Sequence, residues 1–191
     1  MRTMRTVAVA AVLVTALWVS GCTSPKVDFS TIKQPARAAE LDKFKIFVGD
    51  WTWEADVINA EGTYKHWKGK AKWNWILDER CLHGTVSAES GDKKFDAAGI
   101  WSWHPTQKKY FWWMFNNWGY PQQGAATYDD EAKTWCMTYT SVGLDGTTSY
   151  GRYTMKVVDN NTLDWQMQEW VDAMHMMPKM EMKGTYKKQK G

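Results

Sequence analysis

The stretch FDAAGIWSWHPTQKKYFWWMFN, residues 95–116, contains two apolar segments separated by a turn sequence. The segments 95–103 and 109–116 are rich in aromatic residues, which favour β-strands. Between them, His104-Pro105-Thr106-Gln107 supplies residues that accept turn dihedrals or hydrogen-bond their own backbone. A connection this short joins neighbouring antiparallel strands. The stretch therefore predicts a β-hairpin.

The same alternation of strand and turn sequences continues on both sides of this hairpin. Turn sequences such as Asn59–Gly62 and Leu144-Asp145-Gly146 recur roughly every 8 to 14 residues. Ten strands in up-and-down order most easily avoid open edges by closing on themselves. The sequence thus predicts an all-β, closed antiparallel barrel, with strands near 51–58, 64–75, 80–88, 95–103, 109–116, 122–129, 134–141, 147–158, 162–171 and 178–188.

Several of these strands alternate apolar with polar residues, which predicts the faces that point into the barrel. The expected interior sets are Trp51 and Trp53; Tyr153, Met155 and Val157; Leu163, Trp165 and Met167; and Met180 and Met182. The run Tyr110–Phe115 does not alternate. A strand of this kind is covered on both sides, here by a helix outside the barrel, or it exposes an aromatic patch to a partner.

One helix is expected before the first strand. Residues 36–47 contain helix formers with Leu41, Phe44 and Phe47 or Val48 at helical spacing, and Gly49 would end the helix. This is the only helix that we predict in the domain.

Residues 1–22, MRTMRTVAVAAVLVTALWVSGC, have the order of a secretory signal. Arg2 and Arg5 precede an apolar run that is too short to span a bilayer, and small residues then lead to Cys22. The Val-Ser-Gly-Cys ending resembles a bacterial lipobox, which implies a lipidated Cys22. An ordinary signal peptide is the alternative. Thr23, in place of an Asp, favours the outer membrane over the inner membrane.

The expected organisation is therefore a signal peptide at 1–21, a tether at 22–35 and a barrel domain at 36–191. Residues 23–35 carry Ser, Thr, Pro and Lys without periodicity, as a tether would. These features predict a protein of the cell envelope, held by lipid and facing the periplasm or the cell exterior.

Charge and composition exclude some partners. Removal of residues 1–21 takes away two arginines and no acids, so the formal charge falls from +3 to +1. A near-neutral domain has no electrostatic footprint for nucleic acid. The chain has 14 tryptophans, and all but Trp18 follow the signal segment. This number exceeds what the core of one small barrel requires, which points to stacking on a ligand as well as packing.

Cys81 and Cys136 remain after lipidation. In an oxidising compartment they could pair, or each could act as a small buried hydrophobe.

Four segments together carry a resemblance to a known family. They are Phe47-Val48-Gly49-Asp50-Trp51, Leu77-Asp78-x-Arg80-x-Leu82, Gly99-Ile100-Trp101-Ser102-Trp103-His104-Pro105 with Lys108-Lys109-Tyr110, and Gly184-Thr185-Tyr186-Lys187. In this order they resemble bacterial secreted proteins of unknown function with a lipocalin-like barrel. The resemblance implies a calycin-type barrel and no established activity. Nitrobindins, which bind heme, share the Gly-x-Trp; this chain departs from their further glycines, so heme binding is not carried over and no cofactor is expected.

Small-ligand sites in barrels are lined by aromatic side chains with a few polar groups. A small hydrophobic or aromatic molecule, or a sugar, is therefore the expected ligand. The loop Asn116–Pro121 is the expected rim, or else a packed hairpin loop. The predicted binding residues are Trp51, Trp53, Trp101, Trp103, Trp113 and Trp165 in the wall and Asn116, Trp118 and Tyr120 at the mouth.

Residues 174–182, MHMMPKMEM, offer a different possibility. Thioether and imidazole ligands suit Cu(I), so His175 and Met177 are candidate metal ligands. The alternative is that Met180 and Met182 fill the core while the preceding residues form a loop.

The remaining candidates for chemistry are isolated. His66 is expected on an exposed face, His104 in a turn, and His83 could point into the barrel. Asp164 and Glu169 do not form a catalytic pair, because five positions place them on opposite faces of a strand. The sequence has no Ser/His/Asp spacing motif, phosphate loop or His-Glu-x-x-His element, so no specific enzyme is predicted. The alternative to ligand binding is a non-catalytic envelope structural or interaction module.

Overall fold

The computed structural model describes residues 33–190. The chain divides into two units after Ala36, and the second unit contains the regular structure described here. The predicted signal peptide, the predicted lipidation site Cys22 and most of the predicted tether lie outside the described residues. No helix within residues 33–190 is long and apolar enough to cross a membrane.

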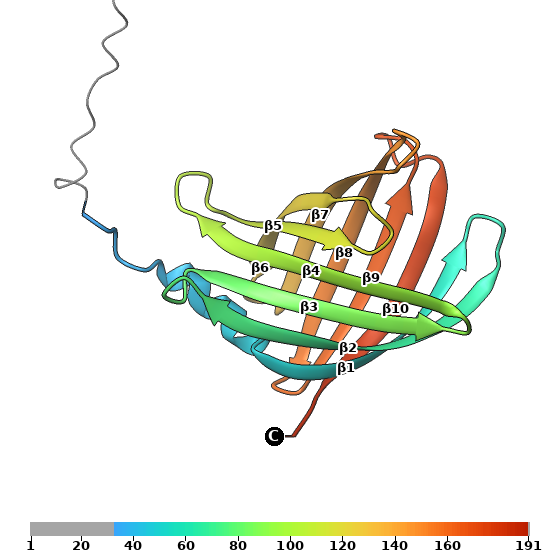
Figure 1. Ribbon diagram of the computed structural model, residues 1–191. Helices are drawn as coiled ribbons and strands as arrows, with labels where there is room; N and C mark the ends of the chain where they lie inside the picture. The colour runs from blue at the N-terminus through green and yellow to red at the C-terminus, as the bar shows by residue number, and fades with distance from the viewer. Residues whose placement is uncertain (1–32, 191) are drawn as a thin grey trace, which may run out of the picture. The chain divides into compact units, whose positions relative to one another are not determined.

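Ten antiparallel strands close into a barrel (Figure 1). Each strand pairs with its neighbours in the sequence, and β1 closes the barrel by pairing with β10. This confirms the predicted all-β, up-and-down barrel, with bounds within two residues of those expected. The strands are β1 Gly49–Asn59, β2 Tyr64–Ile76, β3 Cys81–Ser90, β4 Lys93–His104, β5 Lys109–Asn116, β6 Gln122–Asp129, β7 Thr134–Val142, β8 Thr148–Asp159, β9 Thr162–Trp170 and β10 Pro178–Lys188.

The predicted helix is present as η2 (Ala39–Ile46), but it is a 3-10 helix. Leu41, Phe44 and Phe47 are spaced by three, so each turn of a 3.0-residue helix brings one of them to the same side. All three side chains are buried. The Tyr110 hydroxyl donates to the backbone oxygen of Glu40 at 2.8 Å, which ties η2 to β5.

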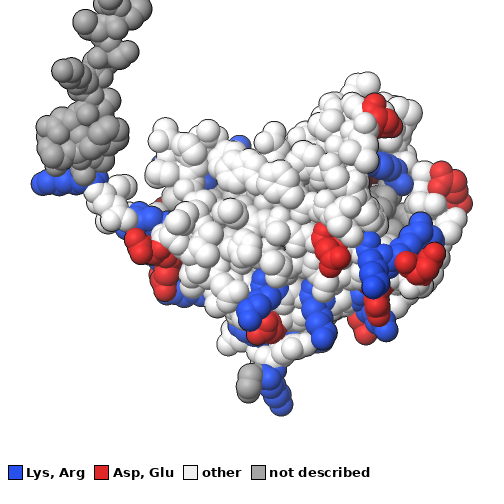
Figure 2. Space-filling view, in the orientation of Figure 1, with Lys and Arg blue, Asp and Glu red and all other residues white. Residues whose placement is uncertain are grey.

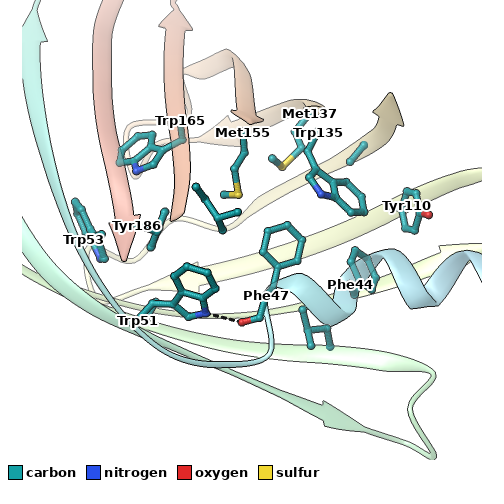
Figure 3. Close-up of a cluster of buried hydrophobic side chains, with 14 of the residues drawn as sticks. Phe44, Phe47, Trp51, Trp53, Tyr110, Trp135, Met137, Met155, Trp165 and Tyr186 are labelled. Carbon is teal, nitrogen blue, oxygen red and sulfur yellow. Dashed lines mark hydrogen bonds between the residues drawn. The ribbon is translucent and has the colours of Figure 1, made fainter. Parts of the chain in front are cut away.

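These helix side chains close one end of the barrel, which we call the helix end. Phe44 is fully buried and stacks on Trp135, with ring centroids 5.4 Å apart. Figure 3 shows Phe44 and Phe47 among Trp51, Tyr110 and Trp135, and the Trp51 indole nitrogen donates to the Phe47 backbone oxygen at 2.6 Å. The β1–β2, β3–β4, β5–β6, β7–β8 and β9–β10 loops lie at the other end, which we call the distal end.

The prediction that a helix covers the outside of β5 is wrong. Tyr110 and Trp112 are buried, whereas Trp113 and Phe115 are 44% and 64% exposed, because alternate residues of a strand point to opposite faces. The helix packs instead against the inward side chain of Tyr110. Phe111, Trp113 and Phe115 thus form an outer aromatic row, which follows the alternative interpretation. Figure 2 shows little charge over β4 and β5.

Candidate functional site

The barrel interior contains a cavity of about 250 Å³. The side chains that close the helix end, such as Phe44, Phe47 and Trp135, do not border it, so it lies toward the distal end. Most of the residues in its wall are aromatic or methionine, and small aliphatic residues and glycines make up most of the rest. The lining aromatic residues are Trp53, Trp67, Trp73, Phe95, Trp101, Trp112, Trp118, Tyr120, Tyr139, Tyr153, Trp165 and Tyr186, and the methionines are Met114, Met137, Met155, Met167, Met180 and Met182.

Glycines opposite the large rings make room for this cavity. A methyl group at Gly84 would overlap the Trp73 ring, and one at Gly151 would overlap the Tyr139 ring. The rings therefore lie against the neighbouring strand and leave space in the lumen, the arrangement known as aromatic rescue of glycine. Five inward aromatic residues have such a partner across the ladder: Trp53–Gly69, Trp73–Gly84, Trp112–Gly124, Tyr139–Gly151 and Trp165–Gly184.

The β5–β6 loop borders the cavity at the distal end. Trp118 packs edge-on against Phe95 and Trp67, with ring centroids 5.2 and 6.1 Å away, and its indole nitrogen donates to the Lys94 backbone oxygen at 3.0 Å. Asn116 fixes the loop, because its amide nitrogen donates to the Tyr120 backbone oxygen at 2.9 Å. The loop thus places the Trp118 and Tyr120 side chains at the cavity, and these hydrogen bonds hold its backbone in position.

One carboxylate lies at the same end. Glu169 is 4% exposed and borders the cavity. The Tyr139 hydroxyl donates to its Oε2 at 3.0 Å, and the Lys179 ammonium donates to its Oε1 at 2.7 Å. Burial, and then the charge of Glu169, raise the pKa of the Tyr139 and Tyr120 hydroxyls. These tyrosines therefore stay neutral donors beside the carboxylate.

Lys179 reaches this position through an irregularity in β10. The register between β9 and β10 shifts between Pro178 and Met180, and a bulge of this kind re-aims a side chain. Lys179 also donates to the buried Ser149 hydroxyl at 2.9 Å. Its side chain stays 48% exposed, so the Glu169 carboxylate is buried while its cation is half in solvent.

Sequence reasoning missed Glu169 as a site residue, although a signal was present. Leu163, Trp165 and Met167 were expected inside the barrel, and the same period of two places Glu169 on their face. The approach of Lys179 had no such signal, because a bulge breaks the alternation.

A second pair of polar groups lies deeper in the cavity wall. Tyr153 and Tyr186 share a side-chain hydrogen bond, and burial raises the pKa of both hydroxyls, that of Tyr186 to about 12. Within residues 33–190, the buried indole nitrogens of Trp53, Trp112 and Trp165 have no hydrogen-bond partner. The Trp135 nitrogen near the helix end is in the same state, so this feature is not confined to the cavity.

The structure brings together five of the predicted binding residues. Trp53, Trp101, Trp165, Trp118 and Tyr120 all border the cavity. The others lie elsewhere.

Trp51 and Trp103 do not border the cavity. Trp51 is buried beside Phe47, and Trp103 packs on Tyr110 with ring centroids 4.7 Å apart. The expected position of Trp113 in the inner wall is wrong. Trp113 follows the inward-facing Trp112 on β5, so its side chain lies on the outer face of the strand. Asn116 braces the loop and is not part of the lining.

The candidate metal loop lies between β9 and β10. The Asp172 carboxylate accepts backbone hydrogen bonds from Met174, Met176 and Met177, and those bonds, the one from Met177 most of all, lower the pKa of Asp172. His175 stacks on Trp170 with ring centroids 4.2 Å apart, and Met177 is 55% exposed. No group of three or more His, Cys, Asp or Glu side chains suited to a metal occurs in the described part of the chain. Copper binding by His175 and Met177 stays a prediction.

The cysteines and remaining histidines take no part in the cavity. Cys81 on β3 and Cys136 on β7 are free thiols on strands that are not neighbours. His83 lies between the inward-facing Leu82 and Gly84 and therefore points away from the lumen, so the possibility that it faces the interior is not met. His104 caps its turn by accepting the Gln107 backbone N–H at 3.2 Å, and His66 pairs with Asp56 on the surface at 2.9 Å.

Known structures share the architecture. No protein-family model matches this chain, and no curated protein sequence matches it. The barrel is similar to Rv2717c from M. tuberculosis, with a TM-score of 0.60 and 11% identity over 81% of this chain and 100% of that one. It is also similar to the S-type phycobiliprotein lyase CpeS from Guillardia theta, with a TM-score of 0.57 and 7% identity over 81% of this chain and 95% of that one. The chain has a lipocalin-like barrel fold. Sequence identities this low show a shared fold and do not show a shared function.

Proposed function

We propose that the barrel binds a small, flat hydrophobic or aromatic molecule in its interior cavity. The observation that carries the proposal is the cavity itself, lined by aromatic and thioether side chains. An apolar cavity of about 150 Å³ accommodates benzene, so about 250 Å³ accepts a larger ring system.

The protein's own side chains leave this part of the lumen unfilled, which supports the same conclusion. The glycines opposite the rings keep this space open, where larger residues would have filled it.

The wall also distinguishes between the ligand classes that the sequence left open. A sugar presents hydroxyl groups on most of its surface, and each buried hydroxyl needs a partner. Besides Glu169, Gln122 and Tyr120, the polar side chains of this cavity are Tyr139, Tyr153 and Tyr186. The hydroxyls of these three tyrosines are already hydrogen-bonded to Glu169 or to one another. A hydrophobic body with few polar atoms fits better than a sugar.

A cavity-filling variant tests the proposal. Naphthalene and indole should bind the wild-type chain and raise its melting temperature, because a ligand that binds only the folded state stabilises it. Ala97 is buried and borders the cavity, so Ala97→Phe should abolish this stabilisation. Ala125 on β6 faces outward and offers the same substitution as a control, since Ala125→Phe should leave binding intact. The proposal would be refuted if calorimetry showed that neither naphthalene nor indole binds the folded wild-type chain.

We also propose that Cys22 anchors the domain to the cell envelope through lipid. The support is the signal-like segment and the lipobox-like ending described above. Metabolic labelling with a tagged fatty acid should mark the wild-type chain and not Cys22→Ala, and the variant should leave the membrane fraction. A wild-type chain without label would count against the anchor.

The outer aromatic row favours a second candidate function, contact with the bilayer surface. A tether of about 14 residues keeps the domain within roughly 50 Å of a lipidated cysteine. Trp side chains favour the membrane interface, and Trp113 and Phe115 are exposed on a face with little charge. Flotation with phosphatidylcholine vesicles should recover the unlipidated domain, and Trp113→Ser with Phe115→Ser should reduce the recovered fraction. Equal recovery of both chains would remove this candidate.

A further inference from the structure

Glu169 is the one charged side chain that borders the cavity within the described residues. Its carboxylate is buried, and two of its lone-pair sites are used, one by Tyr139 and one by Lys179. An ionised carboxylate can accept about four hydrogen bonds, so acceptor capacity remains. Among the residues that line the cavity, the only formal charge is therefore negative, and the lysine that balances it is not part of the lining.

The cation that balances Glu169 is placed so that it can leave. Lys179 does not border the cavity, and its half-exposed side chain comes from the bulge at the start of β10. A second carboxylate lies within its electrostatic reach. Hydrogen bonds from Thr147 are the main cause of the lowered pKa of Asp145, and the charge of Lys179 lowers it further.

We propose that the ligand is a small organic amine with an aromatic or hydrocarbon body, whose ammonium group takes the place of Lys179 on Glu169. This inference rests on the proposed ligand-binding function and names the chemical class of its ligand. The body of the amine occupies the aromatic cavity, and the released Lys179 ammonium turns to solvent and Asp145.

Two physical effects favour this exchange of ammonium groups. A cation is attracted to the faces of aromatic rings, and this attraction grows when water is excluded. The cavity offers such faces in Tyr139, Trp112 and Trp118 at the end where Glu169 lies. A buried carboxylate also requires a positive partner, and the exchange of one ammonium for another keeps Glu169 paired. The exchange returns Lys179 to water, where its charge is well solvated.

A matched pair of probes tests the inference. 2-Phenylethylamine and 2-phenylethanol have the same size and differ in the group that meets Glu169. We expect the full chain to bind the amine at least ~10-fold more tightly, because the ammonium group keeps the buried Glu169 paired with a cation and the neutral alcohol cannot. Calorimetry gives the two dissociation constants.

Three variants locate the effect. Glu169→Gln should remove the preference for the amine while the alcohol still binds. Lys179→Met should bind the amine more tightly than the wild-type chain, because the competing ammonium is gone. Glu181→Gln is the control, since Glu181 pairs with Lys183 at 2.7 Å on the outer face of β10, and it should keep the wild-type preference.

The outcomes separate this inference from the proposed function. Equal binding of the amine and the alcohol to the wild-type chain overturns the inference and leaves the proposed function standing. Binding of naphthalene but not of the amine does the same. Failure of all these probes to bind the folded wild-type chain overturns both. The wild-type comparison decides the matter even where Glu169→Gln does not fold.

Discussion

The Tyr139 hydroxyl is a buried donor to the Glu169 carboxylate. It donates to Oε2 of Glu169 at 3.0 Å, and both side chains are buried. Tyr139→Phe keeps the ring against Gly151 but leaves this carboxylate oxygen without its donor. We expect the free energy of unfolding to fall by about 1–3 kcal/mol, the desolvation cost of an unsatisfied buried acceptor. Urea denaturation of the two chains measures the difference.

The control for this residue is Tyr128→Phe. The Tyr128 hydroxyl takes part in no hydrogen bond among residues 33–190, and its ring still packs on Trp135 after the change. Its effect on the free energy of unfolding should therefore be small. Equal losses in Tyr139→Phe and Tyr128→Phe would mean that the bond to Glu169 contributes nothing to stability.

At the scale of strands and turns, local pattern predicted most of the fold. Turn sequences and the period of two gave ten strands and the inward sets around Trp165 and Met155, because both signals are local. The type of helix was harder to predict from the sequence, since Leu41, Phe44 and Phe47 at a spacing of three also fit one side of an α-helix. The cavity could not be predicted from the sequence for a different reason. Its volume depends on which glycine meets which ring across the ladder, and that register is not a local property.

The 3-10 helix offers a prediction at this scale. The Phe44 side chain is fully buried. It packs on four aromatic rings, those of Trp75, Trp101, Tyr110 and Trp135. Phe44→Ala should lower the free energy of unfolding by about 3–5 kcal/mol, because the helix end would keep a cavity that the rigid wall cannot fill. Phe115→Ala removes the same atoms from a side chain that is 64% exposed, and its cost should be far smaller. Thermal unfolding that shows similar losses for the two variants would contradict the assignment of η2 as a structural closure.

Across the whole molecule, the two ends of the barrel differ in chemistry. The helix end is filled by apolar side chains that pack on one another, such as Phe44, Phe47 and Trp135. The distal end holds the cavity, the buried Glu169 and the half-exposed Lys179. The packed end and the proposed binding site thus lie at opposite ends of the barrel, so variants at the helix end should change the melting temperature without changing ligand preference.

The buried tyrosines make the stability of the whole barrel depend on alkaline pH. Burial raises the pKa of Tyr139 and Tyr153, and it raises the pKa of Tyr110 and Tyr186 to about 12. In the unfolded chain these hydroxyls lose their protons near pH 10, their ordinary value. Below about pH 10 both states keep the protons, and the stability contribution is fully present. Between about pH 10 and 12 the unfolded chain releases protons that the folded barrel retains, so the free energy of unfolding should fall.

Urea denaturation from about pH 9 to about pH 12 measures this fall, with tyrosinate absorbance recorded on the folded chain. Lysines also titrate in this range, so Tyr186→Phe serves as the control. It removes one buried phenol whose pKa is raised to about 12, and the slope of stability against pH should become shallower. Tyr186 also packs on Trp53 and Trp165, and the Phe ring preserves both contacts. An unchanged slope, or full ionisation of the tyrosines near pH 10 in the folded barrel, would show that water reaches these hydroxyls and that the interior is open to solvent.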